Sequence, residues 1–195
     1  MKPILSCIQG NNTKLIEEVS KLFLDRDRII VDITYGKGLF WKGINLDVIG
    51  SDKRGNVDLK ADFRMLPYKS ESVDVVVFDP PYMHGGKTVK KSINQCYQNE
   101  NTSHESVIRN YGLGILEGAR ILKKRGKIFV KCQDEIESGR QRFSHMEVIR
   151  LLELFGFKIL DMFVLMQDHI PTMRLNYQKT SRKNHSYLVV AELRC

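Results

Sequence analysis

The segment Asp79-Pro80-Pro81-Tyr82 holds the residues whose types and order best suit a chemical step. It follows the apolar run 73–78, which predicts a buried strand, so it would form the turn at that strand's carboxyl end. Two successive prolines remove two backbone donors and stiffen such a turn. The Asp79 carboxylate and the Pro80 carbonyl could then present two acceptors to one NH2 group, which carries two donors. Tyr82 offers a flat aromatic face for a base turned out of its stack. The tetrapeptide therefore predicts a site that positions an amine on an aromatic ring.

A glycine-containing loop earlier in the chain predicts a cofactor site. Asp32-Ile33-Thr34-Tyr35-Gly36-Lys37-Gly38 follows a predicted strand and precedes a predicted short helix. Glycines let such a loop turn tightly and approach a ligand, and the amides at the start of a helix can receive a carboxylate. The loop lacks a third glycine at dinucleotide spacing and lacks a Gly-Lys-Ser/Thr sequence. These absences argue against NAD and ATP.

Two further acids end the next two predicted strands. Asp52 could accept hydrogen bonds from both ribose hydroxyls of a nucleoside, and Asp62 could accept one from an adenine amine. Each of them, taken alone, could instead be an aspartate that stabilises a turn. Together with Asp32 they place acids at three successive strand ends. That pattern favours a nucleoside cofactor.

The remaining sequence alternates short β-branched runs with amphipathic helical stretches. This predicts an α/β fold with a doubly wound, mostly parallel sheet of seven strands, in which ligands bind at the carboxyl ends of the strands. The length of 195 residues suits one domain spanning 1–195. Ser144 and Glu147 predict a capping box at the start of the last helix. The expected strands are 28–33, 47–51, 57–61, 73–78, 127–132, 157–166 and 186–193, and the expected helices are one ending near 24, a short one after 38, 104–124 and 144–155.

The net charge of +8 favours an anionic partner, and nucleic acid is the commonest one in the cytosol. A basic surface that serves only solubility is the alternative. No segment approaches the length of a membrane span and the N-terminus lacks a signal-peptide pattern, so we expect a cytoplasmic protein that binds no membrane. The four scattered cysteines predict neither disulfides nor a metal site. Cations gather at Lys123, Lys124, Arg125, Lys127 and Lys131, and again at Arg174, Lys179, Arg182 and Lys183.

The order of these motifs, from Asp32-x-x-x-Gly36-x-Gly38 through Asp52 and Asp62 to Asp79-Pro80-Pro81-Tyr82, resembles a known family. It is similar to the S-adenosylmethionine (SAM)-dependent amino-methyltransferases that modify adenine N6 or cytosine N4 in DNA. The resemblance covers about residues 29–191. It implies a Rossmann-like methyltransferase domain that uses SAM as cofactor and DNA as partner. The Asp form of the tetrapeptide is more typical of adenine enzymes, because cytosine enzymes more often carry Ser there.

The resemblance also assigns roles to residues. It implies a cofactor site made of Asp32, Thr34, Tyr35, Gly36, Gly38, Asp52, Asp62 and Phe63, and a catalytic site made of Asp79, Pro80, Pro81 and Tyr82. The stretch 182–188 resembles the family's entry into its final strand. The stretch 131–135 resembles the segment after the fifth strand in small bacterial and phage members. The expected substrate-binding residues are Lys87, Lys131, Arg182, Lys183, Asn184 and His185.

Three features depart from the family's pattern. Leu39-Phe40-Trp41 follows the glycines where the family has a small hydroxyl residue. The interval between Asp52 and Asp62 leaves hardly any room for a helix. No segment is long enough for a separate target-recognition domain. Choice of a target sequence would have to come from 83–103, from 167–184, or from a partner chain, either a second copy or another subunit.

Other functions stay open at this point. The Asp-Pro-Pro-Tyr sequence also occurs in enzymes that modify guanine in ribosomal RNA, which makes an RNA base methyltransferase the nearest alternative. Cytosine N4 in DNA is a further one. Protein glutamine methyltransferases typically have Asn at the position of Asp79, which ranks them lower. A catalytically inactive SAM-fold subunit is disfavoured because the tetrapeptide and the glycine loop are intact.

Overall fold

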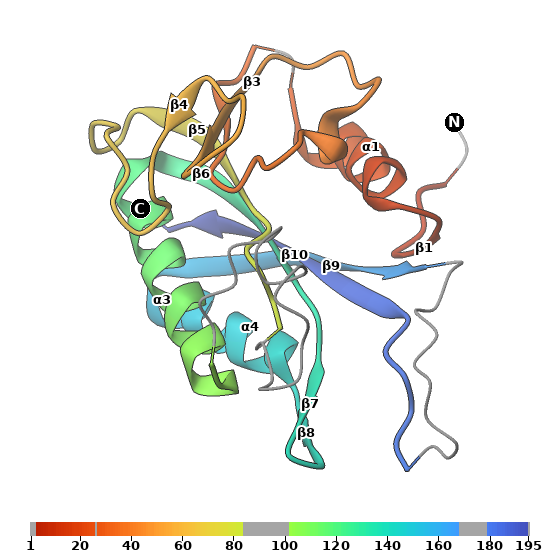
Figure 1. The fold of residues 1–195 in the computed structure, drawn as a ribbon. Coiled ribbons are helices and arrows are strands. Elements are labelled where there is room, and N and C mark those ends of the chain that lie inside the picture. Colours follow the sequence, from red (N-terminus) through yellow and green to blue (C-terminus); the bar gives the residue numbers. More distant parts are fainter. Residues whose placement is uncertain (1–2, 26, 84–101, 168–178, 195) are drawn as a thin grey trace.

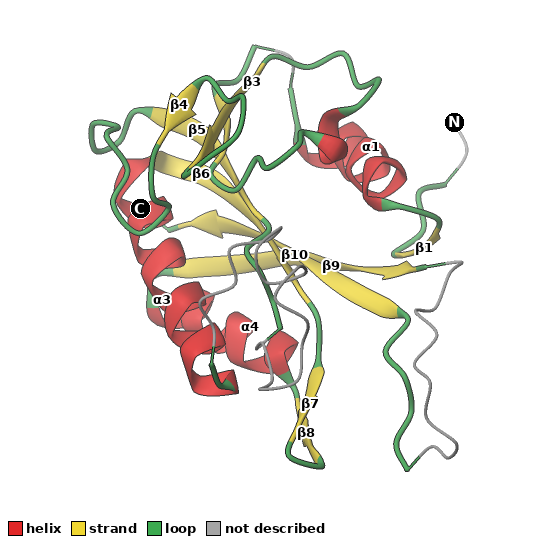
Figure 2. Ribbon diagram, viewed as in Figure 1, coloured by secondary structure: helices red, strands yellow, loops and turns green. Residues whose placement is uncertain are grey.

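One sheet of eight strands runs through the computed structural model, which describes residues 3–25, 27–83, 102–167 and 179–194 (Figure 2). Neighbouring strands are parallel except at the strand formed by residues 185–193, which is antiparallel to both of its neighbours. This confirms the predicted mostly parallel α/β sheet. Across the sheet the order is β1 (Cys7–Gln9), β9 (Phe157–Met166), β10 (His185–Leu193), β6 (Leu122–Cys132), β5 (Val73–Phe78), β2 (Ile30–Asp32), β3 (Val48–Asp52) and β4 (Leu59–Lys60).

The order of the strands reverses between β2 and β5. From β2 the chain continues outward to β3 and β4, and it then returns to β5 and β6 on the other side of β2. Strands β2 and β5 pair directly, with Asp32 opposite Val77. Ligands of doubly wound folds bind at such a reversal, outside the carboxyl ends of the strands. Asp32 and Asp79 therefore stand at the ends of two adjacent strands, at the point where this fold binds ligands.

Helices lie on both faces of the sheet (Figure 1). One face is covered by α1 (Asn12–Phe23), and the other by α3 (His104–Ile121) and α4 (Ser144–Leu154). Alternate residues of β5 enter the two hydrophobic cores: Val75 and Val77 pack on the α1 side, whereas Val76 and Phe78 pack on the α3 and α4 side. A strand that is apolar on both faces is buried on both faces, as the run 73–78 predicted. The carboxyl end of β5 is thus held from both sides.

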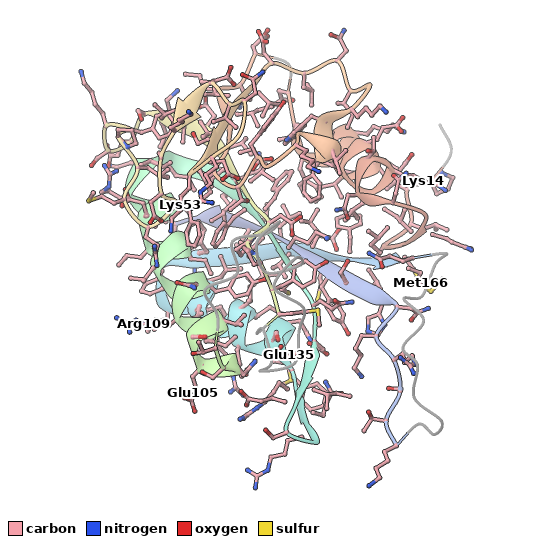
Figure 3. All side chains as sticks on the ribbon, viewed as in Figure 1. Lys14, Lys53, Glu105, Arg109, Glu135 and Met166 are labelled. Carbon is pink, nitrogen blue, oxygen red and sulfur yellow. The ribbon has the colours of Figure 1, made fainter. Side chains whose placement is uncertain are left out.

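Two parts of the structure lie outside the predicted elements. Strand β1 adds an eighth strand at the edge of the sheet, where Gly10 donates its N–H to the Met166 carbonyl and Lys14 Nζ donates to the Gln9 carbonyl. Figure 3 shows Lys14 and Met166 at this edge. A separate two-stranded hairpin joins β7 (Glu135–Glu137) to β8 (Arg140–Arg142). Both were missed because three residues are too few to show a strand period, and the hairpin is largely charged.

One predicted helix end and one predicted helix cap were wrong, although the last helix does begin at Ser144. Helix α3 ends at Ile121 rather than at Lys124, because Leu122 already pairs with Val73 as the first residue of β6. The helical spacing of apolar residues continues through Leu122, so the pattern ran past the true end. Ser144 forms no capping box: Phe143 is the N-cap residue, and Ser144 Oγ is buried without a hydrogen-bond partner among the described residues.

The remaining connections agree with the sequence in outline. Residues 39–41 form a single turn of 3-10 helix, η1 (Leu39–Trp41), and residues 53–58 contain no helix. Most of the two predicted long loops, 83–103 and 167–184, lies outside the described residues. None of the helices in the described part of the chain is long and apolar enough to cross a membrane.

Candidate functional site

The glycine loop turns sharply between β2 and η1. Gly36 and Gly38 have φ angles of +56° and +66°, a left-handed conformation that strongly favours glycine. A Cβ added at Gly36 would meet the Thr34 carbonyl at 3.9 Å as its nearest neighbour, so the space above this residue is open. The backbone at Gly36 is therefore open to a ligand at the end of β2, whereas the Tyr35 ring covers the backbone at Gly38.

Asp32, the last residue of β2, is buried and has both carboxylate oxygens bonded. Oδ1 accepts the backbone N–H of Thr34 at 2.9 Å, and Oδ2 accepts the indole Nε1–H of Trp41 at 2.8 Å. Burial raises the pKa of Asp32 to about 7, although these two hydrogen bonds lower it. A carboxyl group with such a pKa gains from a nearby positive charge, which favours its ionised form. The position is suited to a cationic ligand.

Tyr35 fixes the glycine loop to the neighbouring strand. Its backbone N–H donates to the Ser51 carbonyl at 3.1 Å. Its ring lies directly on Gly50 of β3, where an added Cβ would sit 2.6 Å from Tyr35 Cγ. Glycine at position 50 is thus required for this close approach. The ring of this predicted cofactor residue packs on β3.

Asp52 and Asp62 have different partners. Asp52 Oδ2 accepts the backbone N–H of Gly36 at 2.9 Å, which ties the end of β3 to the glycine loop. Asp62 accepts hydrogen bonds from Arg64 Nε at 3.0 Å and Nη2 at 2.7 Å, and Lys53 Nζ lies 3.2 Å from its Oδ2. Burial raises the pKa of Asp62, but the bonds from Arg64 and Lys53 outweigh it and lower the pKa to about 2. Asp62 is therefore ionised and already holds two cations of its own chain.

Asp79 begins the tetrapeptide at the carboxyl end of β5. Its backbone N–H donates to the Thr34 hydroxyl at 2.7 Å. Its Oδ1 is buried, and Lys131 Nζ lies 3.7 Å away. Burial raises the pKa of Asp79, and the charge on Lys131 opposes that rise. Pro80 is buried, whereas Pro81 and Tyr82 keep partial exposure. The tetrapeptide thus lies directly beside the glycine loop, as a shared site requires.

The predicted substrate residues 182–185 lead into β10, which pairs with β6. Gln133 Nε2 donates to the His185 carbonyl at 2.7 Å, so the carboxyl end of β6 holds this stretch in place. His185 Nε2 lies 3.1 Å from the Tyr187 hydroxyl, and the Tyr187 ring stacks on His145 with centroids 4.4 Å apart. The stretch therefore borders a group of polar aromatic rings at the same edge of the sheet as the tetrapeptide.

The first predicted cluster of cations does not form one surface. Lys123 pairs with Asp74 at 3.1 Å near the amino end of β5, whereas Lys131 is buried at the carboxyl end of β6. The two lysines lie at opposite ends of β6, separated by the irregularity that follows Leu122 and by the regular pairing from Lys127 onward. Of this cluster, Lys131 belongs to the candidate site. Lys87 and Arg174 lie outside the described residues.

Two buried aromatic residues of the site escaped the sequence reasoning. Trp41 binds Asp32 through its indole N–H, and the Tyr111 hydroxyl donates to the Lys131 carbonyl at 2.8 Å. In the sequence, both residues occupy apolar positions and therefore look like ordinary core residues. Their polar groups could have indicated a role in the site, since a buried indole N–H or phenol hydroxyl usually has a hydrogen-bond partner.

Solved structures share this fold at low sequence identity. A SAM-dependent methyltransferase from Methanosarcina mazei has a TM-score of 0.54 at 14% identity, over 90% of this chain and 97% of its own. A Bacillus halodurans protein assigned as a methyltransferase has a TM-score of 0.59 at 12% identity, over 95% of this chain and 100% of its own. SpnF, a 4+2 cyclase, has a TM-score of 0.59 at 14% identity, over 93% of this chain and 80% of its own. No protein-family model and no curated protein sequence matches the chain.

These likenesses establish the architecture as the Rossmann-like fold of class I methyltransferases. The cyclase among them carries the same fold with a different reaction in its name. Fold alone therefore does not fix the reaction, and the function has to be argued from the side chains of the site.

Proposed function

We propose that this protein transfers a methyl group from SAM to the exocyclic amine of a nucleic-acid base, with adenine N6 in DNA as the target. One observation carries the proposal. The Asp79 turn and the glycine loop are joined by the hydrogen bond from the Asp79 N–H to Thr34, at the point where the strand order reverses. The turn that we assign to the amine and the loop that we assign to the nucleoside thus lie side by side.

The glycine loop and the acids around it suit SAM. The buried Asp32 carboxyl favours a cationic ligand, and SAM carries both an ammonium and a sulfonium group. The open backbone at Gly36 allows close approach. Asp52, at the end of β3, is assigned to the ribose hydroxyls, and Asp62 with Phe63, just after β4, is assigned to the adenine. When bound, the cofactor supplies an electrophilic methyl group: the amine lone pair forms the new N–C bond, the C–S electron pair stays on sulfur, and the nitrogen loses one proton.

The tetrapeptide positions the amine. The Asp79 carboxylate and the Pro80 carbonyl accept its two N–H bonds, and the Tyr82 ring supports the base. Holding both hydrogens in acceptors leaves the nitrogen lone pair directed toward the methyl group. Most of the catalytic effect then comes from positioning and electrostatics. Base flipping brings the target out of the helix.

The rest of the nucleic acid is proposed to lie along residues 182–185, and Lys87, outside the described residues, is proposed as a further contact. Arg182 and Lys183 are partly exposed at the entry of β10, on the same edge of the sheet as the tetrapeptide. Cations at such a position would contact phosphates and set the register of the strand. The net charge of +8 supports an anionic partner. A second copy or a partner subunit would supply target selection.

The test is a labelling assay with methyl-labelled SAM and three separate pools: duplex DNA, single-stranded DNA and total RNA. We expect labelled N6-methyladenine from DNA, lost in Asp79→Ala and retained in Asp25→Asn, at an exposed aspartate that precedes the amino end of β2. Label in RNA alone would keep the reaction and replace the substrate. Absence of label from all three pools, with calorimetric binding of SAM intact, would overturn the proposed nucleic-acid target.

A further inference from the structure

Lys131 places a buried ammonium group beneath the tetrapeptide. Its side chain is 1% exposed, at the carboxyl end of β6. Nζ lies 5.0 Å from the centre of the Tyr82 ring and 5.7 Å from the centre of the Phe40 ring. The Tyr111 hydroxyl holds the Lys131 backbone carbonyl. The ammonium is thus confined between a ring of the tetrapeptide and a ring of the turn after the glycine loop.

The counter-charge of Lys131 is Asp79. Nζ lies 3.7 Å from Oδ1, which is close enough for an ion pair but longer than a hydrogen bond. Oδ1 itself is buried and accepts no hydrogen bond from the described residues. The Asp79 side chain nevertheless remains 21% exposed, so its exposure comes from atoms other than Oδ1. One carboxylate oxygen is therefore turned inward to Lys131, while other atoms of the side chain keep its partial exposure.

The other titratable groups around Asp79 do not favour its ionised form. Asp32, on the adjacent strand β2, repels a negative charge on Asp79. Tyr111, on α3, and Cys132, on β6, both have their pKa raised by burial, so both are neutral near pH 7. Lys131 is the cation among the described residues whose charge lowers the pKa of Asp79. Burial lowers the pKa of Lys131, but Asp79, Tyr82 and Cys132 together outweigh it and the net direction is upward, so the ammonium stays charged.

We infer that Lys131 is a positioning residue for Asp79: its ammonium keeps the carboxylate ionised and holds Oδ1 inward, so that the outward side of the carboxylate accepts the target amine. For its effect on turnover the inference rests on the proposed amine methylation. The coupling between the two side chains is a property of the folded chain and is measurable without turnover.

Ionisation of Asp79 matters because of what each form can do. An ionised carboxylate only accepts hydrogen bonds, whereas a protonated one carries a donor. A protonated Asp79 would direct an O–H at an NH2 group that also donates. It would also be unable to take up the proton that the nitrogen loses after methylation. Without Lys131, a desolvated carboxyl group beside Asp32 would favour the protonated form.

The first experiment follows the NMR signal of the Asp79 carboxyl carbon, assigned with Asp79→Asn, through a pH titration. In Lys131→Met we expect the midpoint of Asp79 to rise by at least about one pH unit, as expected for loss of a close opposite charge. Lys131→Arg should remain near the native midpoint. The matched control is Lys123→Met, which breaks another Lys–Asp pair on the same strand, with Asp74. An unchanged Asp79 midpoint in Lys131→Met would overturn the inference.

The second experiment measures turnover on the labelled nucleic acid. We expect Lys131→Met to lower kcat at least about tenfold at neutral pH and to move the acidic limb of the pH profile upward, with SAM affinity unchanged. Recovery in Lys131→Arg would support a charge effect. If the native protein methylates no nucleic-acid amine, the proposed function fails, whereas the carboxyl titration still decides the coupling.

A folding control covers loss of structure. Should Lys131→Met fail to fold, the double variant Lys131→Met/Asp79→Asn leaves no charge unpaired and is expected to fold. Folding of the double variant, with the single variant unfolded, would support a specific Lys131–Asp79 pair. Failure of both, with Asp79→Asn alone folded, would show that Lys131 supports the core independently of Asp79 and would overturn the inference.

Discussion

The hydroxyl of Thr34 accepts the backbone N–H of Asp79 at 2.7 Å, and this bond joins the glycine loop to the tetrapeptide. The two residues follow β2 and β5, which are adjacent parallel strands. The backbone N–H of Thr34 in turn donates to Asp32, which also accepts the Trp41 indole. A chain of hydrogen bonds therefore runs from η1 through the proposed cofactor loop to the proposed catalytic turn. A change at one end is expected to displace the other.

Thr34→Val tests this connection, because valine keeps the shape of threonine and removes the acceptor. The Asp79 N–H would lose this partner, and we expect the free energy of unfolding to fall by about 1–3 kcal/mol. Methyl transfer should lose kcat more than SAM affinity, since Asp79 loses its anchor. Urea unfolding and steady-state kinetics measure the two effects. Thr34→Ser keeps a hydroxyl and serves as control; equal losses in the Val and Ser variants would argue against the hydrogen bond as the anchor.

The raised pKa of Asp32 predicts a dependence of stability on pH. The usual value is 3.8 and burial raises it to about 7, so between these values the folded protein keeps a proton that the unfolded chain has released. Stability therefore falls as pH rises from 3.8 to about 7 and levels off above. Asp32→Asn has no carboxyl group to titrate, so its unfolding free energy should stay flat across this window while that of the native protein falls. Unfolding curves at several pH values measure the difference.

The same carboxyl group predicts proton release on cofactor binding. A cationic ligand beside Asp32 favours the ionised form, so SAM affinity should rise with pH up to about 7 and then level. Calorimetry in buffers of different ionisation enthalpy would detect the released proton. Asp25→Asn, at an exposed position, is the control for both measurements and should follow the native curves. A native stability curve parallel to that of Asp32→Asn would show that Asp32 is already ionised.

The sequence could predict the residues at strand ends but not those that depend on strand pairing. The run 73–78 and the acid that follows it form a local pattern, so the place of Asp79 was predictable. The burial of Lys131 was not, because lysine is exposed by default and its partner lies on another strand. Only the pairing of β5 with β6, which sets Phe78 opposite Val130, brings Lys131 to Asp79. The hydrophobic pattern within each strand does not reveal which residues of the two strands are paired.

The same limit applies to polar contacts across helices. The ring of His104, the first residue of α3, lies between two carboxylates. Nδ1 is 2.8 Å from Glu135 Oε1, and Nε2 is 2.7 Å from Glu147 Oε1. These acids come from β7 and α4, and β7 was not predicted at all. The contact joins the starts of α3 and α4 to the hairpin, and Figure 3 shows Glu135 beside α4.

This arrangement predicts a second pH effect, in a higher window. Burial lowers the pKa of His104, but Glu147 and Glu135 outweigh it and the pKa is raised above 6.5. The stabilisation is therefore fully present below pH 6.5 and is lost as pH rises through the raised pKa. We expect the unfolding free energy of the native protein to fall across this window and that of His104→Gln to stay flatter. Glu147→Gln, which removes one charge, should give an intermediate slope; parallel curves for all three proteins would exclude His104 as the titrating group.

The packing of α3 on Phe78, the residue before Asp79, can be tested with two glycines of the same helix. A Cβ at Gly114 would overlap the Phe78 ring, so Gly114→Ala must displace either the helix or the ring. Overpacking of this kind typically costs about 1–3 kcal/mol, and here it would also disturb the end of β5.

Gly112, on the same helix, provides the control. The nearest atom to a Cβ added there is Leu151 Cδ2 at 3.7 Å, an ordinary contact. Gly112→Ala should therefore stabilise the helix by about 0.5–1 kcal/mol. We expect the unfolding temperature to fall in Gly114→Ala and to rise in Gly112→Ala, with methyl transfer lowered in Gly114→Ala alone. That result would show that Phe78 transmits the position of α3 to Asp79. Equal changes in the two variants would mean that helix propensity alone determines the stability of both.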